Sequence, residues 1–223
     1  EGEVLKDINL IAEPGETIGF LGSTGCGKSS LISLIPRFYD VTRGKVTIDG
    51  VDVRDMKQST LRSIIGICLQ EPVLFSGNIR DAITFGRSDM TDDEMIVASK
   101  AADVDGFVKN IPETYDGKVA RRGANFSGGQ RQRLSIARAL ATKPRILILD
   151  DSTSACDVAT EARIQDAITD MMKNVTKFIV AQRISSVITA DRIVLMEHGR
   201  IVASGTHTEL LAENALYQEI YES

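Results

Sequence analysis

The composition describes a globular protein with a small acidic surplus. The chain has 223 residues, of which 43% are hydrophobic and 26% are charged, enough for one sizeable core. Lys and Arg number 26 against 31 for Asp and Glu, so the net charge is −5, no overall basic field would hold DNA or RNA, and we expect no nucleic-acid partner.

Short apolar runs alternate with segments of helical period along most of the chain. TIGFL at 17–21 precedes a helical segment at 26–38, and ILILD at 146–150 precedes another at 160–172. Further apolar runs lie at 63–70, 177–182 and 191–196. This alternation predicts the α/β class, with a parallel sheet and helices on both of its faces.

Residues 71–142 have a different pattern. Three segments in this stretch, TDDEMIVASKAA, DGFVKNI and RQRLSIARALAT, have helical period, and no convincing strand lies between them. We therefore predict a helical subdomain at 71–142, inserted into an α/β core that is made of 1–70 and 143–223, all within one compact domain.

The C-terminal part contains a hairpin signal followed by a helix signal. The apolar runs RIVLM and RIVASG flank His198 and Gly199, as expected of two antiparallel strands joined by a tight turn. Thr206 and Glu209 have the spacing of a capping box, so a helix should begin near His207.

The sequence indicates neither a membrane span nor a disulfide framework. No run approaches about 18 consecutive apolar residues, and EGEVLKDINL lacks the cationic and apolar regions of a signal peptide. Cys26, Cys68 and Cys156 are a scattered, odd set without a CxxC pair, so we expect buried, reduced thiols in a cytosolic chain. The chain also starts abruptly, as if cut from a longer protein.

The segment GSTGCGKS at 22–29 matches the phosphate-loop pattern G-x-x-x-x-G-K-[ST]. It lies between an expected strand and an expected helix, where glycine-rich backbone can curl its amides around an anion. Lys28 should reach the β- and γ-phosphates of a nucleoside triphosphate, and the Ser29 hydroxyl should bind Mg²⁺. The residues expected to bind the nucleotide are Gly22, Ser23, Thr24, Gly25, Cys26, Gly27, Lys28, Ser29 and Ser30.

The buried strand predicted at 146–150 runs into two adjacent carboxylates. Asp150 would reach the metal at the carboxyl edge of the sheet, where open α/β sheets bind their ligands. Asp151 is not needed for that role and is a candidate catalytic base.

The segment NFSGGQRQRLSIARAL at 125–140 resembles the signature region of ABC transporter nucleotide-binding domains, and the resemblance extends over essentially the whole chain. Gln70 matches the Q-loop of that family, and ILILDD its strand with the metal-binding aspartate. The signature residues are Phe126, Ser127, Gly128, Gly129 and Gln130, and the D-loop residues are Ser154, Ala155, Cys156 and Asp157. The resemblance implies ATP and Mg²⁺ as cofactors, with Ser29, Gln70 and Asp150 around the metal. It also implies a P-loop NTPase core, a mostly parallel sheet flanked by helices, with an N-terminal antiparallel β part and an inserted helical subdomain.

The signature turn adds a second phosphate site to the chain. Ser127 and the amides of Gly128 and Gly129 lie at a predicted helix N-terminus, which favours binding of an anion such as a γ-phosphate. The phosphate loop of the same chain, however, already binds the γ-phosphate of its own nucleotide. In the family that the chain resembles, two domains meet head to tail and each signature closes over the other's ATP. We therefore expect a second nucleotide-binding domain as partner.

Two further segments resemble those of exporter half-transporters: GRIVASGTHTELL near the C-terminus and QEPVLFSGNIRDAI in the central part of the chain. This resemblance implies transmembrane domains fused upstream, with Gln70 and its loop relaying the nucleotide state to them. The expected location is the cytoplasmic face of a membrane, the inner membrane in a prokaryote, with the present segment itself soluble.

Two residues depart from the pattern of the family. After the strand's aspartate the family usually has a glutamate that polarises the attacking water, and this chain has Asp151, shorter by one methylene. Where the family has a switch histidine, the chain has Gln182, which cannot become cationic during phosphoryl transfer. The catalytic set is then Asp151, Gln182 and Gln70, at a site that binds ATP and hydrolyses it slowly.

The function predicted from the sequence is an ATPase of low intrinsic activity, the motor domain of a multidrug-type exporter. Its degenerate site suggests a heterodimer in which a non-identical partner carries the consensus residues. A homodimer with two degenerate sites stays open as the second assembly. The alternative function is a regulatory ATP-binding module with negligible hydrolysis. A DNA-repair or translation ATPase of the same superfamily is disfavoured, because the motifs run uninterrupted.

Overall fold

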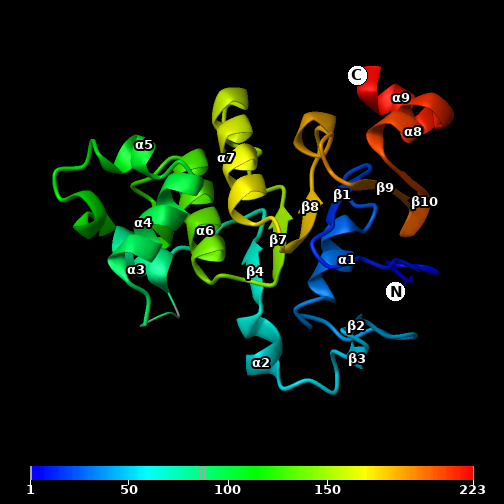
Figure 1. Ribbon diagram of the computed structural model, residues 1–223, viewed down its shortest axis with the longest axis horizontal. Coiled ribbons are helices and arrows are strands. Elements are labelled where there is room, and N and C mark those ends of the chain that lie inside the picture. Colours follow the sequence, from blue (N-terminus) through cyan, green and yellow to red (C-terminus); the bar gives the residue numbers. More distant parts are fainter. Residues whose placement is uncertain (1, 86, 88, 223) are drawn as a thin grey trace. The chain divides into compact units, whose positions relative to one another are not determined.

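The computed structural model describes residues 2–85, 87 and 89–222, and the chain divides into two compact units (Figure 1). The first unit comprises Glu1–Ile65 and Thr176–Ser223, and the second comprises Gly66–Val175. The sequence suggested different limits for a core and an inserted subdomain, 1–70 with 143–223 and 71–142, and that division stays a prediction.

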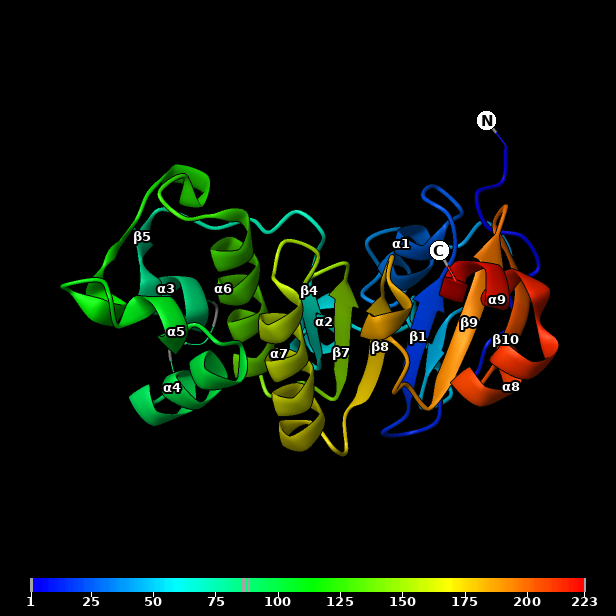
Figure 2. The ribbon, with the colours of Figure 1, turned by 90° about the horizontal axis from the view of Figure 1, so that it is seen from above.

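Four neighbouring strands form the sheet of the first unit, in the order β10-β9-β1-β8 (Figure 2). Their bounds are Thr17–Leu21 for β1, Thr176–Val180 for β8, Arg192–Glu197 for β9 and Arg200–Gly205 for β10. β1 is parallel to both β8 and β9, and β10 is antiparallel to β9. The central position of β1 explains why its sequence is almost wholly apolar, since a strand covered on both faces has no solvent side.

The other elements of the first unit are short. They are α1 (Lys28–Ser33), β2 (Thr47–Ile48), β3 (Val51–Asp52), α2 (Gln58–Ser63), η3 (Ile184–Ser186), α8 (His207–Glu213) and α9 (Ala215–Glu222). β2 pairs antiparallel with β3, so an antiparallel part is present, as the sequence predicted. Leu210 of α8 and Tyr217 of α9 are buried in one cluster with Leu21, Ile193 and Leu195 from the sheet.

The predicted C-terminal hairpin and helix are both confirmed. β9 and β10 are joined at His198 and Gly199, which have φ of 47° and 79°, and consecutive positive φ angles are what a tight hairpin turn requires. Thr206 caps α8 in a complete capping box with Glu209, and the helix begins at His207.

The second unit contains the strands β4 (Ile65–Cys68) and β7 (Ile146–Asp150), which are neighbours in the sheet. β4 begins at the last residue of the first unit. The helices of the second unit are α3 (Ile79–Thr84), α4 (Asp92–Ala101), α5 (Asp105–Val108), η1 (Thr114–Asp116), η2 (Arg121–Gly123), α6 (Gly128–Ala141) and α7 (Val158–Met171). The helices expected from the sequence around α4, α5, α6 and α7 are thereby confirmed.

One expectation for residues 71–142 is wrong, because this stretch contains two short strands. β5 (Gly77–Asn78) pairs antiparallel with β6 (Lys118–Val119). The Ile79 N–H also donates to the carbonyl of Gly117 at 3.0 Å. Two-residue strands have no alternating pattern to detect, and their pairing depends on segments about forty residues apart in sequence.

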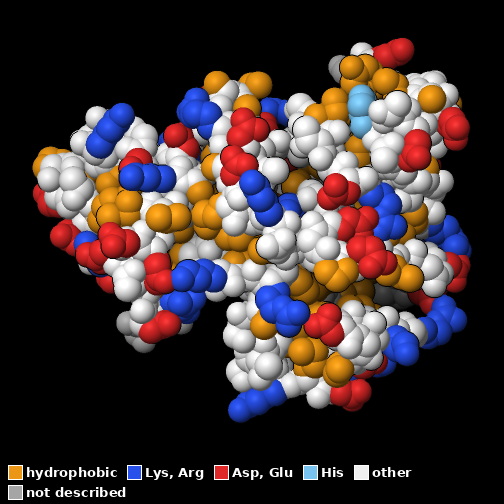
Figure 3. All heavy atoms as spheres, in the orientation of Figure 1, with side chains coloured by type: hydrophobic (Ala, Val, Ile, Leu, Met, Phe, Trp, Pro, Cys, Tyr) orange, Lys and Arg blue, Asp and Glu red, His pale blue; other side chains and the backbone are white. Residues whose placement is uncertain are grey.

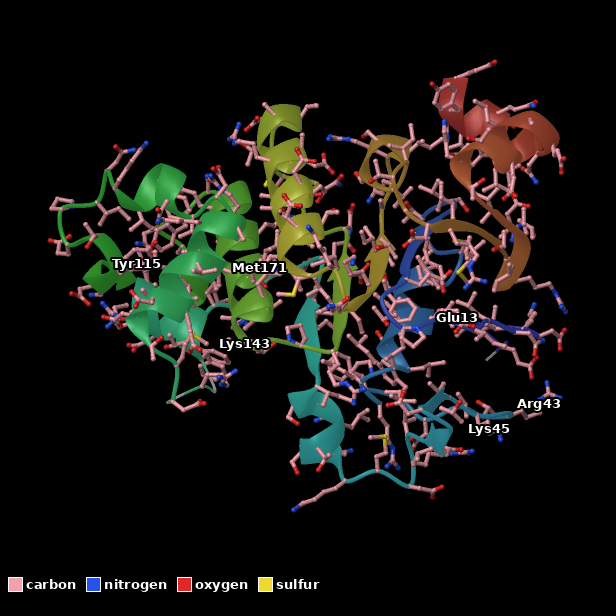
Figure 4. The ribbon with its side chains drawn as sticks, viewed as in Figure 1. Glu13, Arg43, Lys45, Tyr115, Lys143 and Met171 are labelled. Atoms are coloured by element: carbon pink, nitrogen blue, oxygen red, sulfur yellow. The ribbon has the colours of Figure 1, made fainter. Side chains whose placement is uncertain are left out.

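Helix α6 is the central helix of the second unit and packs against α3 and α4 (Figure 2). Its buried residues include Ile136, Ala139 and Leu140, at the i, i+3, i+4 spacing of one helical side. Lys143, just after α6, pairs with Glu94 of α4, and Tyr115 of η1 donates a hydrogen bond to Asp105 of α5; Lys143 and Tyr115 are labelled in Figure 4. Burial, and then the bond to Asp105, raise the pKa of Tyr115 to about 12.

The structure confirms the α/β class with a mainly parallel sheet. Within the described residues, no helix combines the length and the apolar character needed to cross a bilayer. Cys26 and Cys68 are buried free thiols as expected, and burial raises the pKa of Cys68 to about 11, which makes this thiol inert. Cys156 is only partly buried.

Candidate functional site

The phosphate loop connects the carboxyl end of β1 to α1 in the first unit. Gly22, Gly25 and Gly27 have positive φ angles of 145°, 82° and 109°, so the loop takes a backbone path that other residues rarely adopt. Ser23, Thr24, Gly25 and Ser29 are exposed, while Cys26 and Gly27 are buried beneath them. The loop therefore offers its polar side to solvent and is supported from below.

Lys28, the first residue of α1, folds back over the phosphate loop. Its Nζ donates to the carbonyl oxygens of Gly22 at 2.6 Å and Ser23 at 3.0 Å, and lies 3.6 Å from the Cys26 sulfur. The side chain is only 7% exposed. A buried ammonium held this way is a fixed positive charge directed at the concave side of the loop.

Gly22 is the glycine of this loop with the tightest surroundings. An added Cβ would lie 2.2 Å from the carbonyl oxygen of Met196 and 2.9 Å from the Cys26 sulfur. We expect Gly22→Ala to lower the free energy of unfolding by about 2–4 kcal/mol, through left-handed strain plus overpacking against backbone. Denaturant unfolding measures the change.

Gly25→Ala is the matched control for Gly22→Ala. Gly25 also has a positive φ, but an added Cβ would meet nothing within 4 Å. Its expected cost is about 1–2 kcal/mol, from strain alone. Equal losses in the two variants would contradict the role assigned to the carbonyl of Met196.

Gln182 lies at the same edge of the first unit's sheet as the phosphate loop. β8 is parallel to β1 with Phe20 opposite Val180, so Gly22 and Gln182 each lie two residues beyond this pair. The Ala181 N–H donates to the Phe20 carbonyl at 3.2 Å and extends the pairing toward Gln182, which is exposed. Parallel strands bring loops from their carboxyl ends together, and ligands bind there.

The turn between β9 and β10 supports the phosphate loop, a role that the sequence did not reveal. The Gly199 N–H donates to the Cys26 carbonyl at 3.0 Å, and the Gly199 carbonyl accepts from the Lys6 N–H at 2.8 Å. An added Cβ on Gly199 would lie 2.1 Å from the Val4 carbonyl oxygen. The hairpin glycine was visible in the sequence, but its contact with Cys26 is a tertiary feature.

In the second unit, Gln70 and Asp151 lie together. Gln70 follows β4 and its Nε2 donates to the Asp151 carboxylate at 3.3 Å. Asp150, the last residue of β7, is 5% exposed, whereas Asp151 is partly exposed and has a φ of 47°. The left-handed backbone at Asp151 turns the chain sharply after the strand, so the two neighbouring carboxylates differ in environment.

The signature turn caps α6. The Ser127 hydroxyl accepts from the Gln130 N–H at 3.2 Å and the Gln130 side chain accepts from the Ser127 N–H at 2.8 Å, a complete capping box. Phe126 is 6% exposed and packs edge-on against Phe107, with 5.9 Å between ring centroids. Phe126 thus anchors the turn in the core, while Ser127 at the end of a helix of 14 residues faces solvent.

The D-loop follows Asp151 and leads into α7. The Ser154 hydroxyl donates to the Asp151 carbonyl at 2.9 Å. Asp157 caps α7, since its carboxylate accepts from the N–H of Thr160 at 2.9 Å and from its hydroxyl at 2.8 Å. Ser154 and Ala155 are exposed, and Cys156 is half-buried. Gln132 of α6 also reaches this loop, and sequence inspection did not single it out.

The cap at Asp157 predicts a pH-dependent contribution to stability. The hydrogen bonds from the Thr160 backbone and hydroxyl hold the pKa of Asp157 below its usual value. A lowered carboxyl pKa stabilises the fold above about pH 3.9, the ordinary value, and this stabilisation is lost as the pH falls through the folded-state pKa. We expect Asp157→Ala to lower the melting temperature at pH 7 by about 2–4 °C.

Asp157→Asn is the control for this cap, because asparagine caps helices about as well as aspartate and does not titrate. Melting curves between pH 3 and pH 7 should show the deficit of Asp157→Ala shrinking as the solution becomes acidic, with Asp157→Asn close to the parent at pH 7. A deficit that stays constant with pH would contradict a contribution from the ionised carboxylate.

These features together define an ATP-binding domain of the ABC type. The family model described as ABC transporter matches residues 5–154, and the chain belongs to this family. Two relatives from Staphylococcus aureus, of strains NCTC 8325 and COL, are 48% identical to this chain over 221 residues. Both are named as proposed multidrug export ATP-binding/permease proteins. These matches cover 99% of this chain and 38% of each relative.

A solved structure is also similar over almost the whole chain. It is a bacterial Atm1-family ABC exporter with ATP bound, 34% identical, with a TM-score of 0.96. The similarity covers 99% of this chain and 39% of that one. The present chain therefore spans well under half of the length of these relatives.

Proposed function

We propose that this chain is the ATP-binding and ATP-hydrolysing part of an ABC exporter of the multidrug type. ATP binding would bring two such chains together head to tail, and hydrolysis would separate them. One observation carries the proposal, namely that a single chain presents a phosphate loop and, on another helix, a capped signature turn. Two half-sites on one chain need a second chain to complete each of them.

The predicted site residues fit the chemistry of ATP and Mg²⁺. We assign the phosphates to Gly22, Ser23, Thr24, Gly25, Cys26, Gly27, Lys28, Ser29 and Ser30, where Lys28 would exchange its bonds with loop carbonyls for phosphate oxygens. Ser29, Gln70 and Asp150 contribute only oxygen donors, which suit Mg²⁺. Bound Mg²⁺ would offset the negative charge of the phosphates. Signature residues 126–130 and the D-loop would serve the partner's ATP.

We further propose that this chain's own site hydrolyses ATP slowly. Asp151 would take the proton of the attacking water, but its carboxylate is shorter than glutamate by one methylene and accepts a hydrogen bond from Gln70 at 3.3 Å. Gln182 is an exposed amide at the edge of the sheet and cannot supply positive charge. A displacement of about 1 Å in a catalytic group can cost about 10²-fold in rate.

The degenerate site favours a heterodimer. Because the signature turn of this chain is complete and well capped, it can serve a fast site in a partner that carries the consensus glutamate and histidine. A homodimer with two slow sites is the alternative assembly. The alternative function is a regulatory module in which ATP occupancy carries the signal and phosphate release is negligible, and Asp151 with Gln182 gives this reading partial support.

An exposed apolar surface after the Q-loop supports a membrane-domain partner. Phe75 and Phe85 stack with 4.8 Å between ring centroids, yet are 54% and 53% exposed, and Val73, two residues before Phe75 in the chain, is 55% exposed. Figure 3 shows hydrophobic side chains gathered in several places on one face of the molecule. We assign this surface to transmembrane domains, proposed to be fused upstream, which would place the chain on the cytoplasmic side of a membrane.

Phosphate release by the assembled transporter tests the proposed function. The full-length protein, with its partner in lipid, should hydrolyse ATP, and Lys28→Ala should abolish nucleotide binding at this chain's own site. If the parent binds ATP but releases no phosphate, the proposed ATP-hydrolysing function is wrong and the regulatory module is the better description. An upstream sequence without membrane spans would contradict the exporter.

A further inference from the structure

Gln132 is a polar side chain buried on the inner side of the signature helix. It is 4% exposed and lies on the same side of α6 as the buried Ile136 and Ala139. Its Oε1 accepts from the Ala155 N–H at 2.9 Å, and its Nε2 donates to the Ser154 hydroxyl at 3.1 Å and to the Asp151 carbonyl at 3.4 Å. One amide thus uses both of its donor hydrogens and its oxygen on the loop after β7.

The signature turn and the D-loop also touch directly through backbone. An added Cβ on Gly129 would lie 2.7 Å from the Ala155 carbonyl oxygen, and one on Gly128 would lie 3.5 Å from the Ala155 Cβ. The second glycine of the signature is therefore required by this contact within the chain, apart from any contact with phosphate. Because the two segments are closely packed, a movement of the signature turn must also displace Ala155.

The same hydrogen bonds reach Asp151. Its carbonyl accepts from both Gln132 and the Ser154 hydroxyl, and its carboxylate accepts from Gln70. Its φ of 47° is a backbone conformation that needs support from its surroundings. Gln132 is one of the groups that hold this backbone in place.

We infer that Gln132 is a positioning residue that couples the two ATP sites of the assembled dimer. This inference rests on the proposed function, in which the signature serves the partner's ATP and Asp151 serves the chain's own. When the signature turn closes on the partner's ATP, the Gln132 amide carries the displacement to Ser154, Ala155 and the Asp151 backbone. The occupancy of one site thereby changes the geometry of the other.

A double-mutant cycle in the full-length transporter with its partner tests this coupling. Lys28→Ala empties this chain's own site, and we expect it to lower turnover at the partner's site by roughly 5- to 150-fold, the usual range of coupling between sites. In Gln132→Leu, which has similar volume but no amide, the effect of Lys28→Ala should fall below about two-fold. The change should appear in kcat, with KM for ATP unaltered.

Two further variants separate coupling from a general loss of structure. Gln132→Glu keeps the acceptor for the Ala155 N–H and loses the Nε2 donor, so it should retain part of the coupling, and it carries the test if Gln132→Leu does not assemble. Gln218→Leu removes a comparable hydrogen bond, 2.8 Å to the Leu211 carbonyl in the first unit, and should leave the effect of Lys28→Ala complete. An equal effect of Lys28→Ala in the parent and in the Gln132 variants would overturn the inference.

Amide hydrogen exchange gives a second measurement that does not depend on hydrolysis. In the parent, ATP should protect the amides of 127–130 and 154–156 together, whereas in Gln132→Leu it should protect only 127–130. If ATP protects both amide segments of a parent that releases no phosphate, the motor function is contradicted and the coupling is supported. Phosphate release by the parent, with joint protection unchanged in Gln132→Leu, would support the motor function and contradict the coupling through Gln132.

Discussion

Replacing Asp151 by Glu and Gln182 by His together should raise ATP turnover at this chain's own site by about 10²-fold or more. The longer side chain places a carboxylate nearer the attacking water, and general-base assistance is worth roughly 10² to 10⁴ in rate. The histidine adds a donor that can become cationic as charge develops on the γ-phosphate. The gain should be in kcat, because the phosphate loop that binds ATP is unchanged.

The measurement needs the own site in isolation. Phosphate release is followed in the full-length dimer. The partner's site is inactivated by a substitution in the signature turn of this chain, because that turn serves the partner's ATP. Asp151→Asn with Gln182→His is the matched control, which supplies the histidine without a base and should gain little. If the parent's own site already turns over as fast as the repaired site, the slow-site proposal is wrong.

Ser127→Asp should reduce ATP turnover at the partner's site by about 10² to 10³-fold, the cost of losing one well-placed donor to a developing negative charge. Aspartate caps helices as well as serine, so α6 should stay folded and the bond to the Gln130 N–H, 3.2 Å in the parent, should be kept. The added carboxylate would face the γ-phosphate and repel it. Steady-state hydrolysis and thermal unfolding measured on the same preparation separate the two effects.

Ser127→Asn is the control for the charge at this position. It is also a good cap and is neutral, and its side-chain N–H can donate to the γ-phosphate in place of the hydroxyl, so most of the activity should return. Loss of turnover in Ser127→Asn equal to that in Ser127→Asp would mean that the hydroxyl itself, and not electrostatic repulsion, decides the rate. A normal rate in Ser127→Asp would contradict the assignment of the signature to the partner's ATP.

Features set by neighbouring residues were predictable from the sequence. The phosphate loop, the caps at Ser127 and Thr206, and the turn at His198 and Gly199 all depend on spacings of a few residues, where side-chain chemistry and backbone preference agree. The alternation of strands and helices likewise predicted the α/β class. For the same reason the capped helix α8 begins where the spacing of Thr206 and Glu209 places it.

Features that join distant segments were not predictable in the same way. The pairing of β5 with β6 and the bond from Gly199 to Cys26 link residues whose separation in sequence gives no periodic signal. Gln132 reads as one more polar residue of a basic helix, although it is 4% exposed and bonded to the D-loop. Only its place four residues before Ile136 and seven before Ala139, on one buried side of α6, hints that it points inward.

The buried ring of Phe126 has a consequence for how such domains diverge. The ring contacts Phe107 in the interior, while the polar part of the signature turn begins one residue later at Ser127. Evolution can therefore exchange one bulky hydrocarbon for another at this position, at the cost of local repacking only. Related domains can therefore differ at residue 126 while the polar groups of the signature turn stay the same.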